Sequence, residues 1–288
     1  MLLAHTPLVD PDIKKQVFVI NSALQPANVE LGSWHTQTYL DQFESWIKSS
    51  TYNKIIGLED FAHKAYCAGV SDAIAVFVSR HVKHKRIRFG RAEFMGAKGN
   101  SNAMQANWCY LEDDEIRSDD AVILSWPYAG NGDQIPDQAE LLEKCQRLNV
   151  PVMIDLAYFG ISHGMSFDLT QSCITDVAIS LSKPLNVPLR LGMRWTRNHH
   201  DDKIQGLSDS KIYNRLAVHT GIGLMQTFSH NWLVDKYLPI YNDICAKHNL
   251  QTTPTITLAL GNSEEHKEFF RNGYYRICVT DELLQNIF

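Results

Sequence analysis

Short apolar runs alternate with helical patterns through the middle of the chain, and this alternation restricts the fold more than any other feature. Apolar residues recur at helical spacing between Ser71 and Val82, and a second helical pattern covers Gln138 to Leu148. The expected strands are 87–89, 121–126, 151–155, 177–181 and 191–195. Neighbouring parallel strands need crossover connections, which are usually helices. The order therefore predicts an α/β fold with a mainly parallel sheet flanked by helices.

The end of the chain has a different pattern, without this regular alternation. The elements expected there are a helical stretch over Tyr213–Leu238, apolar runs at 253–260 and 275–280, and a polar helix from Ser263. We therefore predict a large domain over residues 53–203. A smaller α+β domain would combine residues 1–52 with residues 204–288.

Charge and composition exclude several classes of protein. The formal net charge is −5, which gives no general attraction to nucleic acid or acidic membranes. The basic run at 80–91 is interpreted as the last turn of a helix followed by a strand. No apolar stretch approaches the roughly 18 residues of a membrane span, and the first ten residues lack the pattern of a signal peptide. We therefore expect a cytoplasmic protein. The six cysteines form no CxxC pair, so we expect no metal site.

A lysine directly after a predicted buried strand is the sharpest chemical feature. The segment reads Ser180-Leu-Ser-Lys-Pro-Leu-Asn-Val-Pro-Leu-Arg-Leu-Gly192, so that Lys183 is followed by Arg190. A desolvated amine beside other cations loses proton affinity, and Schiff-base formation with a carbonyl cofactor requires this. Arg190, Ser180 and Ser182 offer charge-assisted hydrogen bonds to a phosphate. The alternative is a surface lysine at a strand end, with the arginine paired to a carboxylate.

A carboxylate and a phenol stand together at the end of the preceding predicted strand. Asp155 ends the strand, and Tyr158 follows it. Parallel sheets bind ligands at the carboxyl ends of their strands. A pyridoxal 5′-phosphate (PLP) enzyme needs a carboxylate against the pyridine nitrogen, so that the ring accepts electrons, and Asp155 is the candidate. Tyr158 either donates to the phenolic oxygen of the ring or caps the strand end as a half-buried aromatic.

Taken together, DxAY at 155–158, SxSK at 180–183 and RxG at 190–192 resemble fold-type I PLP-dependent enzymes, above all class I/II aminotransferases. The resemblance runs from about residue 52 to 195, with a looser match at 274–280. It implies that Lys183 carries PLP as a Schiff base. It also implies an aspartate-aminotransferase-like large domain, with Lys183, Asp155 and Tyr158 as catalytic residues.

Further matches assign more residues to the cofactor and the substrate. Gly69, Val70 and Ser71 resemble the family's phosphate-binding turn, where free N–H groups open a helix, although a serine N-cap is the simpler interpretation. Tyr52, in a YxxxxGL segment, implies a homodimer, because this tyrosine reaches the phosphate of the neighbouring subunit's cofactor. Phe94 falls where an aromatic ring stacks on the pyridine, with Met95 as the alternative. Arg276, in an RI segment, implies binding of the substrate α-carboxylate.

Two departures from the family pattern bear on the reaction. Ala129 stands where the family's NPxG loop supplies an asparagine to the phenolic oxygen of PLP, so either Tyr158 alone serves that oxygen or Asn131 substitutes. Losing one hydrogen bond to a charged group costs roughly 1.5–3 kcal/mol, which leaves cofactor binding possible. The chain is also compact for the family, which puts the residues that recognise the substrate side chain in doubt.

These features predict an aminotransferase that acts on an amino acid and a keto acid. A decarboxylase, lyase, racemase or cyclase would show nearly the same residues, because the ring labilises any bond at Cα. A non-catalytic protein with the PLP fold is the remaining alternative. The sequence does not identify the substrate side chain.

Overall fold

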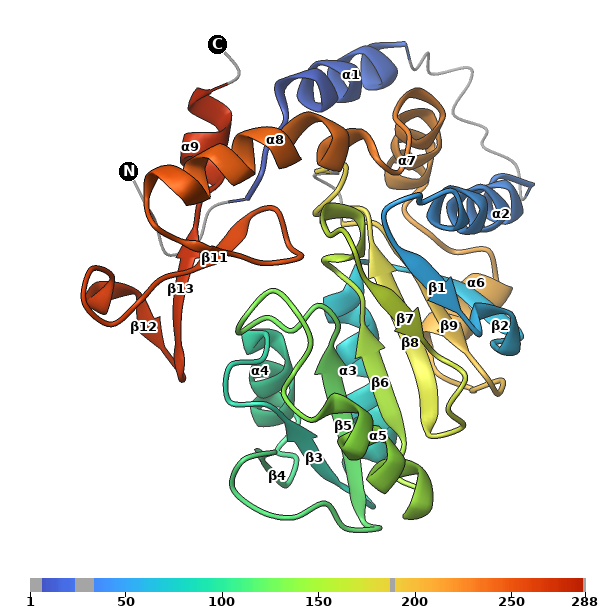
Figure 1. Ribbon diagram of the computed structural model, residues 1–288. Coiled ribbons are helices and arrows are strands. Elements are labelled where there is room, and N and C mark those ends of the chain that lie inside the picture. Colours follow the sequence, from blue (N-terminus) through green and yellow to red (C-terminus); the bar gives the residue numbers. More distant parts are fainter. Residues whose placement is uncertain (1–6, 24–33, 187–189, 287–288) are drawn as a thin grey trace.

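A seven-stranded sheet with helices on both faces forms the centre of the protein, as seen in the computed structural model, which describes residues 7–23, 34–186 and 190–286 (Figure 1). The strand order is β2-β9-β8-β6-β5-β3-β4. The strands are β2 (His63–Cys67), β3 (Arg86–Phe89), β4 (Trp108–Tyr110), β5 (Asp120–Ser125), β6 (Val152–Asp155), β8 (Ile174–Ser180) and β9 (Gly192–Thr196). Six of them run in the same direction, and β9, which lies between β2 and β8, is antiparallel to both. The predicted α/β fold with a mainly parallel sheet is confirmed.

Alternate residues of each strand face opposite layers, as the twofold side-chain period of a strand requires. In β5, Ala121 and Ile123 belong to one core and Val122 and Leu124 to the other. The first core includes α3 (Val70–His81) and α4 (Met95–Ala103), and the second includes α5 (Gln138–Arg147). The sheet is therefore buried on both faces.

The remaining elements surround one edge and one end of this sheet. Helices α1 (Pro11–Ser22) and α2 (Trp34–Lys48) both contact α7 (Arg215–Thr227). A four-stranded antiparallel sheet lies beside α8 (Trp232–Lys247) and α9 (Thr280–Gln285) (Figure 1). Its strands are β10 (Gln251–Thr252), β11 (Leu258–Leu260), β13 (Tyr274–Cys278) and β12 (Phe270–Arg271). Strands β1 (Lys54–Ile56) and β7 (Ser166–Asp168) form a separate pair, and α6 (Lys203–Asp209) follows β9. The division into residues 53–203 and the rest stays a prediction.

Two expected elements differ from the structure. The helical stretch over Tyr213–Leu238 is two helices, because the chain at Phe228 turns extended and α8 begins only at Trp232. The polar helix from Ser263 is a turn followed by a short 3-10 helix over Lys267–Phe269. The side chain of Asn262 caps this turn by accepting from the N–H groups of Glu264 and Glu265. The turn does not continue as an α-helix, because the backbone at His266 (φ −126°, ψ 31°) leaves the helical conformation.

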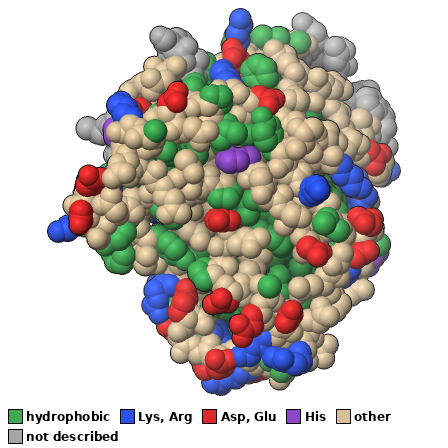
Figure 2. Space-filling model, in the orientation of Figure 1, with side chains coloured by type: hydrophobic (Ala, Val, Ile, Leu, Met, Phe, Trp, Pro, Cys, Tyr) green, Lys and Arg blue, Asp and Glu red, His purple; other side chains and the backbone are tan. Residues whose placement is uncertain are grey.

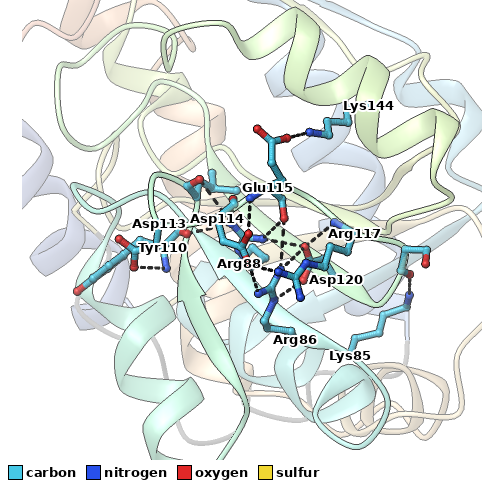
Figure 3. A network of polar contacts seen from close by, with 12 residues as sticks. Lys85, Arg86, Arg88, Tyr110, Asp113, Asp114, Glu115, Arg117, Asp120 and Lys144 are labelled. Carbon is cyan, nitrogen blue, oxygen red and sulfur yellow. Dashed lines mark hydrogen bonds and ion pairs between the residues drawn. The ribbon is translucent and has the colours of Figure 1, made fainter.

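The basic run at 80–91 is the end of α3 followed by β3, as interpreted from the sequence. Arg88 and Asp120 are both fully buried, and an Arg88 Nη1–Asp120 Oδ2 bond of 2.8 Å joins them (Figure 3). Arg86 binds the other oxygen of Asp120 at 2.7 Å. Charged side chains of both signs also mix at the lower end of the face in Figure 2. These arginines therefore fasten β3 to the start of β5, at the opposite end of the strands from Lys183.

In the part of the chain that the structure describes, no helix is long and apolar enough to span a membrane.

Candidate active site

Lys183 lies in the turn after β8, half-buried, with Nζ 5.4 Å from the centre of the Tyr158 ring. Packing fixes this turn, since the N–H of Leu185 donates to the carbonyl of Leu181 at 3.0 Å and both leucines are buried. A Cβ at Gly160 would lie 2.6 Å from Pro184, so glycine is what allows the turn to close on the end of β6. Burial, and then the charge of Arg276, lower the pKa of Lys183, while Asp155 opposes them. A larger fraction of Lys183 is therefore a neutral, nucleophilic amine than in a solvated lysine.

Asp155 is 4% exposed at the carboxyl end of β6, directly beside the end of β8. Its Oδ1 accepts from the N–H of Ala157 at 2.8 Å. Burial, followed by the charge of Glu93, raises the pKa of Asp155 to about 7, against the hydrogen bond from Ala157 and the charge of Lys183. This carboxyl group can thus hold or release a proton near neutral pH, whereas the carboxyl group of a solvated aspartate is already deprotonated there.

Tyr158 and Arg276 complete the cluster from two different sheets. Arg276 on β13 of the small sheet donates from Nη2 to the Tyr158 hydroxyl over a long 3.5 Å contact. Among the residues that the structure describes, none forms a hydrogen bond with the buried Nε of Arg276. Burial raises the pKa of Tyr158, and the charge of Arg276 opposes this. An unpaired buried guanidinium nitrogen is costly unless a ligand binds it, so Arg276 presents an anion-binding group beside Lys183.

A second group of polar atoms lies between the end of β8, Arg190 and the start of α3. Gly69 has φ +78° and ψ 172°, a conformation open mainly to glycine, and α3 begins directly after it without a side-chain cap. A Cβ at Gly69 would lie 3.5 Å from Ser180 Oγ and 3.8 Å from Arg190 Nη2. The free N–H groups at Val70 and Ser71, a serine hydroxyl and a guanidinium therefore converge on one small space.

The residues around this space are held by their own contacts. Arg190 donates from Nε to the carbonyl of Ala68 at 3.3 Å, which fixes the guanidinium beside the turn. The hydroxyl of Ser180 donates to the carbonyl of Leu191 and accepts from the N–H of Ser182. Gly69, Ser180, Ser182 and Arg190, which the sequence assigns to a phosphate, thus lie together.

The loop after β5 contains Ala129 and Asn131, the two positions that bear on the missing asparagine. Asn131 uses its amide within its own turn, because Oδ1 accepts from Asp133 N at 2.9 Å and Nδ2 donates to the Gln134 carbonyl at 2.8 Å. Ala129 is buried, and its N–H donates to Ser125 Oγ at 2.9 Å. Whether Tyr158 alone or Asn131 serves the phenolic oxygen stays a prediction.

Two predicted residues are not brought into this cluster. The hydroxyl of Tyr52 donates to Asp235 Oδ1 at 2.8 Å, at the surface of the subunit. The ring of Phe94 is 45% exposed and folds back over Gly96, while Met95 is 84% exposed. Contact of Tyr52 with a partner subunit and stacking of Phe94 on a cofactor both stay predictions.

Sequence reasoning missed Glu93. Its carboxylate accepts from Ser125 N at 2.8 Å and from the hydroxyl of Ser125, and its charge acts on Asp155. The available signal was a carboxylate directly beside Phe94 in the loop after β3, which alone does not distinguish a site residue from a solvated one.

A small pocket beside Lys183 extends the site toward the small sheet. Besides Lys183, Ser182 and Tyr158, mainly apolar groups line it: Pro7, Leu8, Ile161, Thr257, Leu258 and Cys278. The chain segment before α1 and the small sheet therefore share one wall of the space beside the lysine.

No protein-family model matches the chain, and no curated protein is similar enough in sequence to count as a match. Solved structures do match. The tyrosine aminotransferase from Leishmania infantum superposes with a TM-score of 0.66 at 12% identity, over 97% of this chain and 89% of that one. The histidinol-phosphate aminotransferase from Clostridium acetobutylicum gives 0.61 at 14% identity, over 98% and 96% of the two chains.

A PLP-bound C-S lyase from Staphylococcus hominis is similar to the same degree, with a TM-score of 0.61 at 14% identity over 95% of this chain and 82% of the lyase. The fold is thus that of fold-type I PLP-dependent enzymes, resembling the class I/II aminotransferases. At these identities, the likeness speaks for the fold, and the chemistry has to be argued from the site.

Proposed function

We propose that this protein is a PLP-dependent aminotransferase. The observation that carries the proposal is the meeting of Lys183, Asp155, Tyr158 and Arg276 near the carboxyl ends of β6 and β8, together with the grouping of Gly69, Ser180 and Arg190 at the start of α3. Several of the solved structures with this fold are described as PLP-bound enzymes.

The residues present fit PLP in three independent respects. The missing Cβ at Gly69 leaves room between Ser180 and Arg190, where a phosphate would be held with the N–H groups of α3. Asp155 lies beside the lysine and would face the ring nitrogen. The unpaired Nε of Arg276 is the group that a substrate carboxylate would satisfy.

When bound, PLP supplies an electron sink that weakens the bonds at the substrate Cα. The chain's own residues supply the rest. Lys183 would hold the cofactor through Nζ and, when its amine is free and neutral, would accept a proton from Cα and donate it again as the ammonium group. Asp155 would keep the proton on the ring nitrogen. Tyr158 would donate to the phenolic oxygen without help from position 129, and Arg276 would orient the substrate carboxylate.

The experiment is a half-reaction monitored by absorbance. Protein reconstituted with PLP is mixed with each amino acid in turn, and the cofactor is then extracted and identified. An aminotransferase converts PLP to pyridoxamine 5′-phosphate, loses its visible band, and regains it when a keto acid is added. Lys183→Ala serves as the control that holds no covalent cofactor. If PLP binds and no amino acid yields the pyridoxamine form, the aminotransferase proposal fails.

A lyase is the second candidate, and the observation that favours it is Ala129. Without an asparagine at this position the phenolic oxygen of PLP loses one donor, which changes the electron distribution of the ring by a hydrogen bond worth roughly 1.5–3 kcal/mol. One of the similar structures is a C-S lyase. Release of ammonia and a keto acid from one amino acid, with PLP recovered unchanged, would identify this reaction in the same assay.

A further inference from the structure

Glu93 is a carboxylate of the candidate site, and it has no assigned role in the proposed reaction. It lies in the loop between β3 and α4 and is half-buried. Oε2 accepts from the N–H of Ser125 at 2.8 Å, and Oε1 accepts from the N–H of Phe94 at 2.8 Å and from the hydroxyl of Ser125. Three donors thus fix this carboxylate in one orientation. Burial raises the pKa of Glu93, and the bonds from Ser125 and Phe94 oppose this by stabilising the charged form.

The bonds to Ser125 place Glu93 next to Asp155. Ser125 is the last residue of β5, and its register partner in the parallel strand β6 is Asp155 itself. The N–H of Trp126, the next residue, donates to the Asp155 carbonyl at 2.8 Å. Ser125 Oγ also accepts from Ala129 N, so the same serine links Glu93 to the loop that lacks the family's asparagine. A negative charge is thereby held at the point where β5 and β6 end.

The groups that face Asp155 come from several elements. Glu93 after β3 disfavours its charged form, whereas Lys183 after β8 and the N–H of Ala157 favour it. Tyr158 lies near both carboxylates. Glu93 in turn is acted on by Glu112, an exposed carboxylate that accepts from the N–H of Arg91. The positive charge of Lys183 disappears when the amine is neutral, which leaves two carboxylates close to one another.

We infer that Glu93 is a positioning residue that acts through Ser125 and Asp155: its carboxylate, held by Ser125 beside Asp155, helps to keep the proton on the ring nitrogen of bound PLP. The part that concerns the ring rests on the proposed function. The physical reason is that a second negative charge makes loss of the shared proton less favourable. A protonated ring nitrogen is the better electron sink, so Glu93 would offset what the ring loses at Ala129.

The test compares Glu93→Gln with wild type, since glutamine keeps the size and an acceptor for Ser125 N but removes the charge. In the PLP-loaded protein, ¹⁵N NMR of ring-labelled PLP reports the protonation of the ring nitrogen against pH. In the ligand-free protein, ¹³C NMR of labelled aspartate follows the protonation of the Asp155 carboxyl group. Its signal is assigned as the one that is missing in Asp155→Asn. We expect the midpoint of both titrations to fall by about one pH unit in Glu93→Gln.

Two matched variants separate charge from packing. Glu112→Gln removes an exposed charge from the same region and should leave both midpoints within a few tenths of a pH unit of wild type. Ser125→Ala removes one bond that fixes Glu93 but keeps the charge, so the midpoints should stay closer to wild type than in Glu93→Gln. If the role of Glu93 were purely structural, the midpoints of Glu93→Gln would stay closer to wild type than those of Ser125→Ala.

Unchanged midpoints in Glu93→Gln would overturn the inference while leaving the proposed function intact. A fall at Asp155 in the ligand-free protein without a change at the ring nitrogen would overturn it as well. If wild-type protein does not bind PLP, the proposed function fails instead, and the ligand-free titration still decides whether Glu93 controls the proton on Asp155.

Discussion

The carboxyl group of Asp155 illustrates how a single buried residue trades stability for chemistry. Its pKa rises from the ordinary 3.8 to about 7 on folding, through burial and then through Glu93. The folded protein therefore holds a proton that the unfolded chain has released. Below about pH 4 the carboxyl group is protonated in both states, and the shift does not lower the free energy of unfolding. As the pH rises from about 4 to about 7, the free energy of unfolding falls.

Asp155→Asn should consequently stabilise the ligand-free protein at pH 8, by about 2 kcal/mol in the free energy of unfolding, since one unit of pKa corresponds to about 1.4 kcal/mol and the site relaxes in part. Near pH 5 the gain should be much smaller, because wild-type Asp155 is then largely protonated. Urea unfolding of both proteins at the two pH values measures it. An equal difference at pH 5 and pH 8 would show that the ionisation of Asp155 is not responsible.

The turn before α3 works at the scale of an element, because its backbone supplies the anion site. Gly69→Ala should weaken PLP binding by roughly tenfold or more, since the new methyl group occupies the space between Ser180 and Arg190 and strains a backbone with φ +78°. Gly164→Ala is the matched control, because Gly164 has φ +71° but nothing within 4 Å of its Cβ. Both variants should lose similar stability.

Equilibrium titration with PLP, followed by the visible band, gives the affinities of the two glycine variants. Equal PLP affinities in Gly69→Ala and Gly164→Ala would mean that this turn does not hold the phosphate.

Element order and strand ends were readable from the sequence, since apolar runs fix buried strands and ligands collect where parallel strands end. Lys183 and Asp155 could be found for this reason. Glu93 could not, because its place depends on bonds to Ser125 across the loop after β3. The break between α7 and α8 was missed because the spacing of apolar residues continues through Phe228 and Trp232.

At the scale of the whole molecule, Tyr52 bears on the predicted homodimer. In one subunit its hydroxyl binds Asp235 and lies at the surface, where a partner's cofactor phosphate would be the alternative acceptor. Tyr52→Phe should therefore lower PLP affinity roughly 10- to 150-fold, the equivalent of one hydrogen bond to a charged group at 1.5–3 kcal/mol.

A complementation experiment decides whether Tyr52 acts between subunits. Lys183→Ala and Tyr52→Phe chains, unfolded and refolded together, should form hybrid dimers with one complete site, made from Lys183 of one chain and Tyr52 of the other. Wild-type PLP affinity should return for that fraction of sites. If mixing restores none, Tyr52 does not act across a subunit interface.

The central claim is that Lys183 binds PLP covalently, and an absorbance spectrum tests it most directly. Purified wild-type protein reconstituted with PLP should show the visible band of lysine-bound cofactor. After reduction with borohydride, the cofactor should remain covalently attached, as a label, to the peptide that contains Lys183. Lys183→Ala should lack both the band and the label while remaining folded. A reconstituted wild-type protein without the band, or a band that persists in Lys183→Ala, would contradict this account.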